Sequence, residues 1–252
     1  MELRDATILV TGATSGFGLA TAERFAREGS RLVLAGRRRD RLESLARRVG
    51  VPALALPLDV RDRAAVERAV AGLPREFAAV DVLVNNAGLA LGLEPAHRAS
   101  LDEWEQMIDT NCRGLVVLTR AILPGMVERG RGHVVNVGSV AGTYPYPGGN
   151  VYGATKAFVH QFSLNLKADL LGTGVRVTSV EPGMAETEFS LVRLGDEARA
   201  RKVYEGMKPL SGADVADAIH WCVTRPAHVN VNVLELMPES QAFSPFAVKR
   251  TS

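Results

Sequence analysis

A tyrosine and a lysine stand four residues apart in the stretch NVYGATKAF. If this stretch is helical, Tyr152 and Lys156 share one face, because side chains four apart are neighbours on an α-helix. A phenol has an ordinary pKa near about 10, so it exchanges protons poorly at neutral pH unless its anion is stabilised. A nearby ammonium group stabilises that anion by Coulomb attraction. The pair predicts acid–base chemistry, with an ordinary surface pair as the alternative.

A serine precedes this pair by thirteen residues, after the apolar run HVVNVG. A hydroxyl at the carboxyl end of a parallel strand faces the ligand crevice of an open α/β sheet. Ser139 is therefore a candidate for contact with the reacting oxygen of a substrate. A helix cap or a turn is the alternative interpretation for a serine in this place.

Three glycines follow the first apolar run, in VTGATSGFGLA. Gly12, Gly16 and Gly18 have the spacing G-x3-G-x-G, which differs from the G-x-G-x-x-G of the usual dinucleotide fingerprint. The physics is similar, because glycines permit a tight turn and close backbone approach. The following helix offers unpaired N–H groups to a pyrophosphate. We expect a phosphate-binding turn here, with a simple tight turn as the alternative.

Two further strand ends carry polar residues. Asp59, in LDV, is positioned to accept a hydrogen bond from an adenine amino group, unless it is a solvated turn acid. Asn85 and Asn86, in VLVNNAGLA, can satisfy backbone groups and hold the turn, as in an Asx-type turn. The small residues Ala87 and Gly88 then leave room for a ribose or nicotinamide ring.

The second apolar run ends in LVLAGRRR. In this kind of sheet the second strand ends beside the adenosine ribose, where an acid binds the hydroxyls of NAD and repels a 2′-phosphate. No acid stands here; Gly36 leaves space, and Arg37 and Arg38 supply guanidinium donors, which suit phosphate. The sequence predicts a preference for NADP. A nucleic-acid patch is disfavoured, because 28 acidic residues nearly balance 30 basic ones.

Short apolar runs alternate with longer helical patterns, which predicts a doubly wound parallel sheet that positions these groups. The predicted strands are Thr7–Thr11, Arg31–Ala35, Ala53–Asp59, Val80–Asn85, His133–Val137, Val175–Glu181 and Val231–Leu236. The predicted helices are Gly18–Gly29, Arg38–Arg48, Asp62–Gly72, Leu101–Pro124, Val151–Leu171 and Ala213–Thr224. Residues 183–209 break the alternation, and we expect them to form a lid over the ligand.

The composition fits one α/β domain of 252 residues, with 46% apolar and 23% charged residues and a net charge of +2. The two cysteines have no metal-ligand spacing, so no metal is expected. The start lacks the features of a signal peptide, and no apolar run approaches about 18 residues. We expect a cytoplasmic protein without membrane or nucleic-acid partners.

Taken together and in this order, the motifs resemble the short-chain dehydrogenase/reductase family over essentially the whole chain. The family's nucleotide motif matches Thr11–Gly18, its structural motif matches Asn85–Gly88, and its PG motif matches Pro182 and Gly183. The resemblance implies a single Rossmann domain over residues 1–252, with a seven-stranded parallel sheet in the order 3-2-1-4-5-6-7 and helices on both faces.

The resemblance also assigns roles to residues. The catalytic set falls on Asn111, Ser139, Tyr152 and Lys156. Lys156, together with an oxidised nicotinamide, is expected to lower the pKa of Tyr152 by about 3 pH units. Such a change needs about 4 kcal/mol of interaction that favours the anion over the neutral phenol. Asn111 is expected to fix a water molecule in a proton relay to Lys156, and its place within the long fourth helix fits a local kink. The expected contacts of NADP are Gly12, Thr14, Ser15, Gly16, Phe17, Gly18, Arg37, Arg38, Asp59, Val60, Asn86, Ala87, Gly88, Tyr152, Lys156, Pro182, Gly183 and Thr187.

Stretches such as NNAGLALGLEPAH and GGNVYGATKAFVHQFSLNL resemble the NADP-dependent 3-hydroxy acid dehydrogenases within this family. That resemblance implies serine, allo-threonine, 3-hydroxypropionate or malonic semialdehyde as substrates, bound by Ser139 and Tyr152. Arg193 in the lid is our candidate for holding the substrate carboxylate. A 3-oxoacyl thioester reductase and a non-catalytic NADP-binding sensor stay open.

The resemblance further implies a homotetramer. The stretch MPESQAFSPFAVKR follows the last predicted strand, and we expect the tail, residues 238–252, to pack on a neighbouring subunit. A disordered tail is the alternative.

Overall fold

The structure, a computed structural model, describes residues 2–243, and its seven strands form one parallel sheet. The order β3-β2-β1-β4-β5-β6-β7 confirms the predicted topology. The strands are β1 (Thr7–Thr11), β2 (Arg31–Gly36), β3 (Ala53–Pro57), β4 (Val80–Asn85), β5 (Gly132–Val137), β6 (Val175–Pro182) and β7 (Val233–Leu236).

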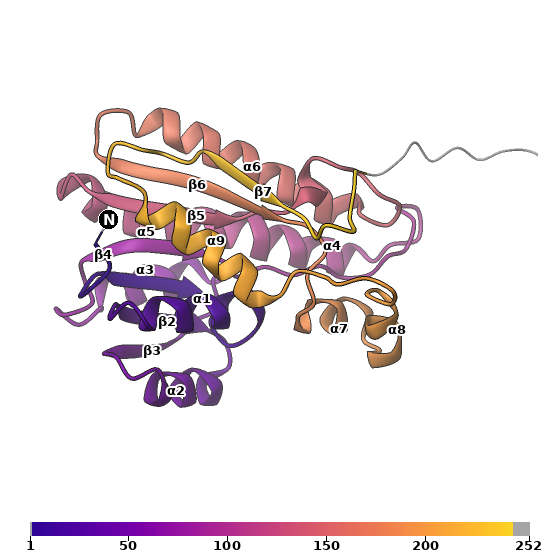
Figure 1. Cartoon of the computed structure of the whole chain (residues 1–252), viewed down its shortest axis with the longest axis horizontal. Helices are drawn as coiled ribbons and strands as arrows, with labels where there is room; N and C mark the ends of the chain where they lie inside the picture. The colour runs from indigo at the N-terminus through magenta and orange to yellow at the C-terminus, as the bar shows by residue number, and fades with distance from the viewer. Residues whose placement is uncertain (1, 244–252) are drawn as a thin grey trace, which may run out of the picture.

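Helices cover both faces of the sheet (Figure 1). The face with α1 (Gly16–Ala26), α2 (Arg39–Arg48) and α9 (Gly212–Thr224) buries one apolar cluster. The opposite face carries α3 (Arg63–Ala71), α5 (Leu115–Glu128) and α6 (Asn150–Asp169) over a second cluster. Strand β1 shows why the core divides: Ile8 and Val10 point to the first cluster and Leu9 to the second, because successive side chains alternate.

Two strands are shorter than the sequence predicts. The ladder of β3 ends at Pro57, because Asp59 forms a turn in which its carboxylate accepts the N–H of Arg61. Strand β7 begins at Val233 rather than Val231, because the Asn230 side chain bonds both backbone groups of Val177 in place of regular pairing. Both corrections come from side-chain amide or carboxylate groups that compete with the ladder.

The predicted fourth helix is three consecutive segments. Helix α4 (Leu101–Ile108) passes into a π-helical turn, η1 (Asp109–Gly114), and then into α5. The π-helical turn contains Asn111, at the place where the sequence predicts a kink. The predicted end at Pro124 is wrong, because α5 continues to Glu128 with the proline inside it. A proline removes one helical hydrogen bond, which neighbouring bonds can tolerate.

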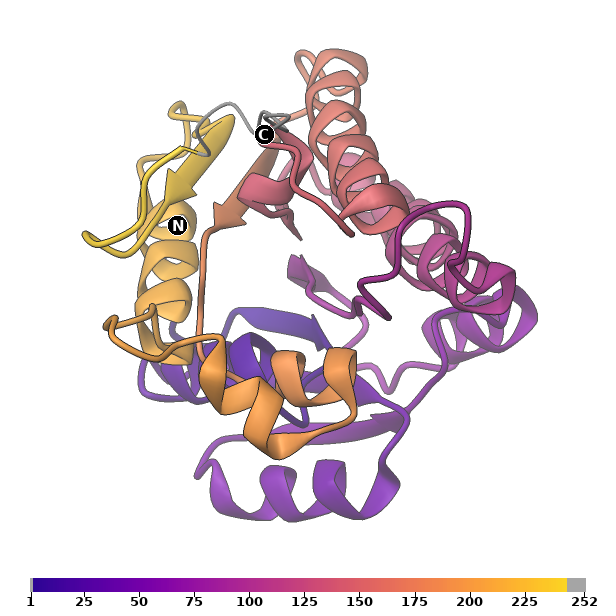
Figure 2. The same cartoon turned by 90° about the vertical axis from the view of Figure 1, so that its right-hand side faces the viewer.

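The lid contains two short helices that the sequence did not predict, α7 (Glu188–Leu194) and α8 (Glu197–Lys202). Thr187 and Asp196 cap their N-termini, and Gly195, with φ of 63°, ends α7. Figures 1 and 2 show α7 and α8 beyond the sheet, at the end where the carboxyl ends of the strands lie. The segment therefore lies where a cover over a ligand is expected.

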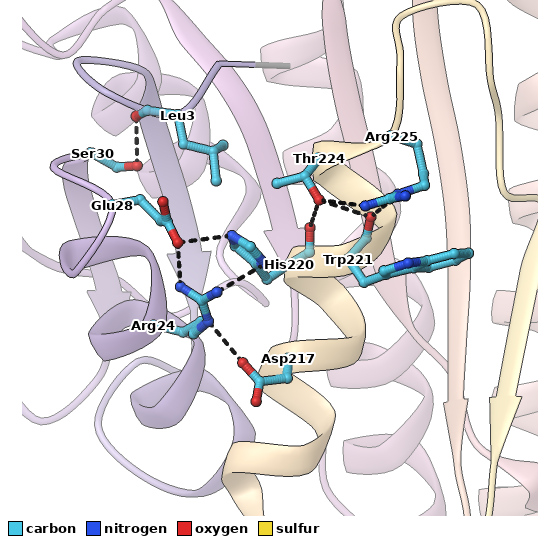
Figure 3. A network of polar contacts seen from close by, with 9 residues as sticks. All are labelled: Leu3, Arg24, Glu28, Ser30, Asp217, His220, Trp221, Thr224 and Arg225. Atoms are coloured by element: carbon cyan, nitrogen blue, oxygen red, sulfur yellow. Dashed lines mark hydrogen bonds and ion pairs between the residues drawn. The ribbon is translucent and has the colours of Figure 1, made fainter.

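Charged side chains join helices α1 and α9 (Figure 3). The guanidinium of Arg24 contacts Glu28 at 2.5 Å, Asp217 at 2.7 Å and His220 Nδ1 at 3.1 Å. His220 Nε2 in turn lies 3.1 Å from Glu28. This group, called the Arg24 cluster below, ties the first helix to the last.

Within residues 2–243, no helix is long and apolar enough to cross a membrane. Part of the predicted tail, residues 244–252, lies outside the described residues. The described part turns back on its own chain, since the Gln241 side chain accepts the N–H of Met184 at 2.7 Å. The ring of Phe243 also lies 4.6 Å from that of Tyr144, between centroids.

Candidate active site and dinucleotide cavity

A cavity of about 880 Å³ opens at the carboxyl ends of the strands and beneath the lid. Among the residues predicted as cofactor or catalytic contacts, all but Gly18 and Asn111 line it. Gly36 and Val137, at the ends of two strands, line it as well. The structure thus brings together residues that the sequence spreads from Gly12 to Arg193.

The glycine turn and the NNAG turn are joined to each other. Gly12 and Gly16 have φ of +64° and +52°, a conformation that other residues rarely adopt. Gly18 has a steric role behind the cavity, because a Cβ there would meet the Gly12 carbonyl and lie 2.5 Å from Asn86 Nδ2. The Thr11 hydroxyl accepts the N–H groups of Asn86 at 2.9 Å and Ala87 at 2.8 Å.

Arg38 lies over the glycine turn. Its Nε and Nη2 donate to Thr14 Oγ1 at 2.9 and 2.7 Å, and its Nη2 also donates to Ser15 Oγ at 2.8 Å. The Ser15 hydroxyl forms no cap for α1, so a side chain does not occupy the helix N-terminus there. Exposed Arg37 lines the cavity nearby. Guanidinium groups at one end of the cavity, beside this helix start, fit the phosphates of the predicted dinucleotide.

Asp59 lines the cavity with its carboxylate already engaged. It accepts hydrogen bonds from the backbone N–H, Nε and Nη2 of Arg61, the shortest at 2.6 Å. The bond from the Arg61 side chain is the main reason that the pKa of Asp59 is lowered. The adenine contact predicted for Asp59 would use a carboxylate that a neighbouring arginine holds in place.

Ser139 combines both interpretations made from the sequence. Its hydroxyl caps a 3₁₀ turn, η2 (Val140–Gly142), by accepting the N–H of Ala141 at 3.1 Å. The same side chain faces the Tyr152 hydroxyl, where its hydrogen bonding partly opposes the rise in the pKa of that phenol that burial causes. A cap and a contact at the reacting end of the cavity are therefore compatible.

Lys156 and Tyr152 lie close together, but their pKa values shift against the expectation from the spacing. Lys156 Nζ lies 5.9 Å from the centroid of the Tyr152 ring and donates to the Val137 carbonyl at 2.8 Å. Burial lowers the pKa of Lys156 to about 8 and raises that of Tyr152 to about 12. In the chain by itself, desolvation outweighs the neighbouring cations. The expected lowering also counted an oxidised nicotinamide, which is not part of the chain.

Asn111 lies behind the cavity and orders its wall. The Asn111 side chain accepts the N–H of Leu89 at 2.9 Å and donates to the Leu89 carbonyl at 2.8 Å. Its Nδ2 also donates to Thr155 Oγ1 at 3.0 Å, which links the π-helical turn to α6. A Cβ at Gly88 would lie 3.2 Å from Asn111 Oδ1 and 3.6 Å from Lys156 Nζ, so these groups are neighbours.

Arg193 reaches from α7 to the reacting end of the cavity. Its guanidinium donates to the Gly92 carbonyl at 3.1 Å, the Tyr146 hydroxyl at 2.9 Å and the Gly148 carbonyl at 3.3 Å. It also lies 5.5 Å from the centroid of the Tyr152 ring. The lid residue chosen from the sequence is thus beside the candidate acid–base group.

Two aromatic residues at this end were missed in the sequence. Phe189 of the lid lies 5.6 Å from Tyr152 between ring centroids, and Tyr146 hydrogen-bonds Arg193. The stretch TYPYPGG, between Ser139 and Tyr152, could have indicated Tyr146. Its prolines and glycines are typical of a loop, and loops often carry the residues that bind ligands. Nothing local marked Phe189, whose contact depends on the fold of the lid.

Comparisons with known proteins place the chain. Residues 6–195 match the family model described as short chain dehydrogenase. An NADP-dependent 3-hydroxy acid dehydrogenase of Salmonella typhi is 56% identical, over 97% of this chain and 99% of that protein. A serine 3-dehydrogenase of Rhizobium radiobacter is 53% identical, over 98% and 99%.

A solved structure agrees with these relatives. The closed form of a serine dehydrogenase complexed with NADP+ superposes with a TM-score of 0.96 at 55% identity, covering 97% of this chain and all of that one. The geometry of the cavity, the family match and the close relatives lead to one conclusion: the chain belongs to the short-chain dehydrogenase/reductase family.

Proposed function

We propose that this chain transfers a hydride between NADP(H) and a short 3-hydroxy acid or its 3-oxo acid or semialdehyde. One observation carries the proposal. Ser139, Tyr152, Lys156 and Arg193 meet at one end of a cavity whose other end carries Arg37 and Arg38. The first end suits an alcohol that bears a carboxylate, and the second suits a dinucleotide that bears an extra phosphate.

Tyr152 is the group that takes the proton from an alcohol and returns it to a carbonyl. The bound cofactor supplies the nicotinamide C4 that accepts or gives the hydride. Ser139 donates a hydrogen bond to the substrate oxygen and steadies the charge that develops on it. Lys156 places a cation near the phenol, and the neighbouring Asn111 holds the wall of the cavity through its hydrogen bonds to Leu89 and Thr155.

Arg193 is our candidate for the substrate carboxylate. Its three nitrogens are held by two backbone carbonyls and one phenol, so its guanidinium is fixed in direction before any ligand arrives. An ordered guanidinium loses less conformational entropy when it binds a carboxylate in a bidentate way. The guanidinium carbon lies 5.5 Å from the centroid of the Tyr152 ring, so a carboxylate bound by Arg193 would lie beside the candidate acid–base group.

A substrate panel tests this proposal. Turnover of serine, allo-threonine, 3-hydroxypropionate, 3-hydroxyisobutyrate and acetoacetyl-CoA is measured with NADP and with NAD. We expect the 3-hydroxy acids to be oxidised with NADP and the thioester to be a poor substrate. Preference for acetoacetyl-CoA would establish a thioester reductase instead. Tight NADP binding without turnover of any of these compounds would establish a sensor.

Variants refine the two ends of the cavity. Arg193→Ala should raise KM for serine about 10- to 100-fold, whereas Arg199→Ala, an exposed lid arginine, should not. An unchanged KM in Arg193→Ala would remove Arg193 from the substrate site.

Replacing both Arg37 and Arg38 by alanine should lower the preference for NADP over NAD at least about tenfold. Full preference in that double variant would refute their role.

A homotetramer is the assembly that we propose. Phe158 of α6 is 42% exposed and stacks with Phe162 at 5.9 Å, which leaves an aromatic surface on a long helix. Light scattering coupled to size-exclusion chromatography should give four chains for the parent and fewer for Phe158→Glu. A monomer for the parent protein would contradict the proposal.

A further inference from the structure

The lid places a carboxylate against the arginines that follow β2. Glu188, the first residue of α7, lies 3.1 Å from Arg38 Nη1 and 3.0 Å from Arg41 Nη1. Its two carboxylate oxygens divide between them, with Oε2 toward Arg38 and Oε1 toward Arg41. The three side chains come from α7, from the start of α2 and from its first turn, so this contact joins the lid to the cofactor end of the cavity.

Arg38 directs its other nitrogens elsewhere. Its Nε and Nη2 donate to Thr14 and Ser15, which leaves Nη1 as the nitrogen that faces Glu188. Arg38 and Glu188 both line the cavity, and Arg41 does not. A phosphate that approached Arg38 from the cavity would therefore meet a guanidinium that a lid carboxylate has partly neutralised.

The contact of Glu188 with the two arginines depends on where the lid lies. A Cβ on Gly16 would lie 3.4 Å from Thr187 Cβ, so the residue before Glu188 rests on the glycine turn. The carboxylate reaches the arginines because the lid lies on this turn. Glu188 is 45% exposed and Arg38 is 41% exposed, so solvent and salt screen the interaction but do not remove it.

We propose that Glu188 is a specificity-determining residue that weakens the recognition of the 2′-phosphate and so sets how strongly NADP is preferred over NAD. The inference rests on the proposed binding of this phosphate by Arg37 and Arg38. A carboxylate and a phosphate that share a guanidinium repel each other, and the repulsion disappears for a ligand without the 2′-phosphate. The lid thereby limits the affinity for the phosphorylated cofactor, which must leave after each turnover.

Binding of cofactor fragments tests this without turnover. Titration calorimetry gives the dissociation constants of 2′,5′-ADP and 5′-AMP for the parent and for Glu188→Gln, which keeps the shape and removes the charge. We expect Glu188→Gln to bind 2′,5′-ADP about two- to fivefold more tightly and 5′-AMP unchanged. The gain should shrink at about 1 M salt, where charges are screened within about 3 Å.

The matched control is Glu186→Gln. It removes the same charge from an exposed lid residue two positions earlier, which does not line the cavity. We expect both ligands to bind this variant as they bind the parent. Glu188→Ala, compared with the parent by circular dichroism, repeats the measurement in case the glutamine variant is misfolded.

Two outcomes overturn the inference and are distinguishable. If Arg38→Ala weakens 2′,5′-ADP but Glu188→Gln binds it equally or more weakly than the parent, the role of Glu188 is refuted and that of Arg38 stands. If Arg38→Ala leaves 2′,5′-ADP binding unchanged, the phosphate site itself is wrongly placed, and the inference falls with it. An equal gain in Glu186→Gln would also refute it, because the effect would then be general to lid charge.

Discussion

The Arg24 cluster and the Tyr152–Lys156 site both take ionisable side chains out of water, and they treat the charge in opposite ways. The Arg24 side chain is 20% exposed and has Glu28 and Asp217 as counter-charges. Lys156 is 8% exposed and donates to the neutral carbonyl of Val137. Within residues 2–243, Lys156 has no ion pair at all. One region pairs its charge with carboxylates. The other leaves its charge without an ion-pair partner, which we call uncompensated, because the distant Glu181 only partly offsets the effect of burial.

The pKa values follow this difference. In the Arg24 cluster, the hydrogen bond from Arg24 is the largest effect on Glu28 and lowers its pKa, which favours the charged form. At the active site, burial lowers the pKa of Lys156 from 10.5 to about 8, which disfavours the charged form. That shift corresponds to about 3 kcal/mol of lost stability while the lysine is protonated. Groups with displaced pKa values concentrate at functional sites, where stability is given up for chemistry.

The largest expected effect comes from the uncompensated region. Tyr152→Phe removes the hydroxyl and leaves the ring in its contacts with Phe189 and Arg193. We expect kcat to fall about 10²- to 10⁴-fold, because acid–base catalysis is lost, while NADP binding changes little. Stopped-flow turnover and fluorescence titration measure the two quantities.

Tyr144→Phe is the matched control for this variant. It removes a hydroxyl from another tyrosine that lines the same cavity, and it should keep kcat within about twofold of the parent. Near-parental turnover by Tyr152→Phe would show that the acid–base group lies elsewhere.

The second effect is a gain in stability. Lys156→Met keeps the length of the side chain and removes a buried charge that has no ion-pair partner in the described residues and only a distant carboxylate, Glu181, acting on it. We expect the free energy of unfolding at about pH 7 to rise by about 1–3 kcal/mol while turnover is lost. Urea unfolding at a fixed protein concentration measures it. If Lys156→Met were less stable than the parent, the charge of Lys156 would stabilise the fold, as the paired charge of Arg24 does.

The third effect has the opposite sign and occurs in the Arg24 cluster. Arg24→Met leaves Glu28 and Asp217 without their cation, so we expect unfolding to become easier by about 1–2 kcal/mol, with kcat unchanged. The same urea titration measures it. Arg63→Met is the control, because the Arg63–Glu67 pair lies on the surface and its loss should change the stability much less than Arg24→Met does. An equal loss of unfolding free energy in Arg24→Met and Arg63→Met would show that the Arg24 cluster contributes no more than an ordinary surface ion pair.

The two regions also differ in how far the sequence predicts them. Local patterns placed β1 and β4 at their observed bounds, and the position of Asn111 indicated the break in the long helix. Ser139 could be chosen because it follows a strand end, and Tyr152 and Lys156 because they share a helical face. Asn111 came from the family resemblance alone. Bounds were wrong where side chains of Asp59 and Asn230 replace ladder bonds, which period and propensity do not encode.

The ion pairs could not be predicted in the same way. Arg24 meets Asp217 across 193 positions, and Arg38 meets Glu188 across 150, so no local spacing signals either pair. The direction of the pKa shift of Tyr152 also escaped the sequence. The spacing of Tyr152 and Lys156 predicts that the two side chains are close. It does not predict the burial that raises the pKa of the phenol to about 12.

The pH dependence of stability tests most directly whether Lys156 is an uncompensated charge. The unfolded chain binds more protons than the folded one between the folded pKa of about 8 and the ordinary value of 10.5. Stability through this group is therefore lowest below about pH 8 and rises as the pH increases toward 10.5. The pKa of Tyr152 shifts in the opposite direction, from 10.0 to about 12. Because Tyr152 is present in both the parent and Lys156→Met, its effect largely cancels when their unfolding free energies are subtracted.

The measurement is the difference in unfolding free energy between Lys156→Met and the parent, from about pH 7 to about pH 10. We predict an advantage of the methionine variant of about 1–3 kcal/mol at the lower pH that falls steadily toward zero at the higher. A difference that stays constant with pH, or that favours the parent at about pH 7, would contradict the claim that the active site keeps an uncompensated charge.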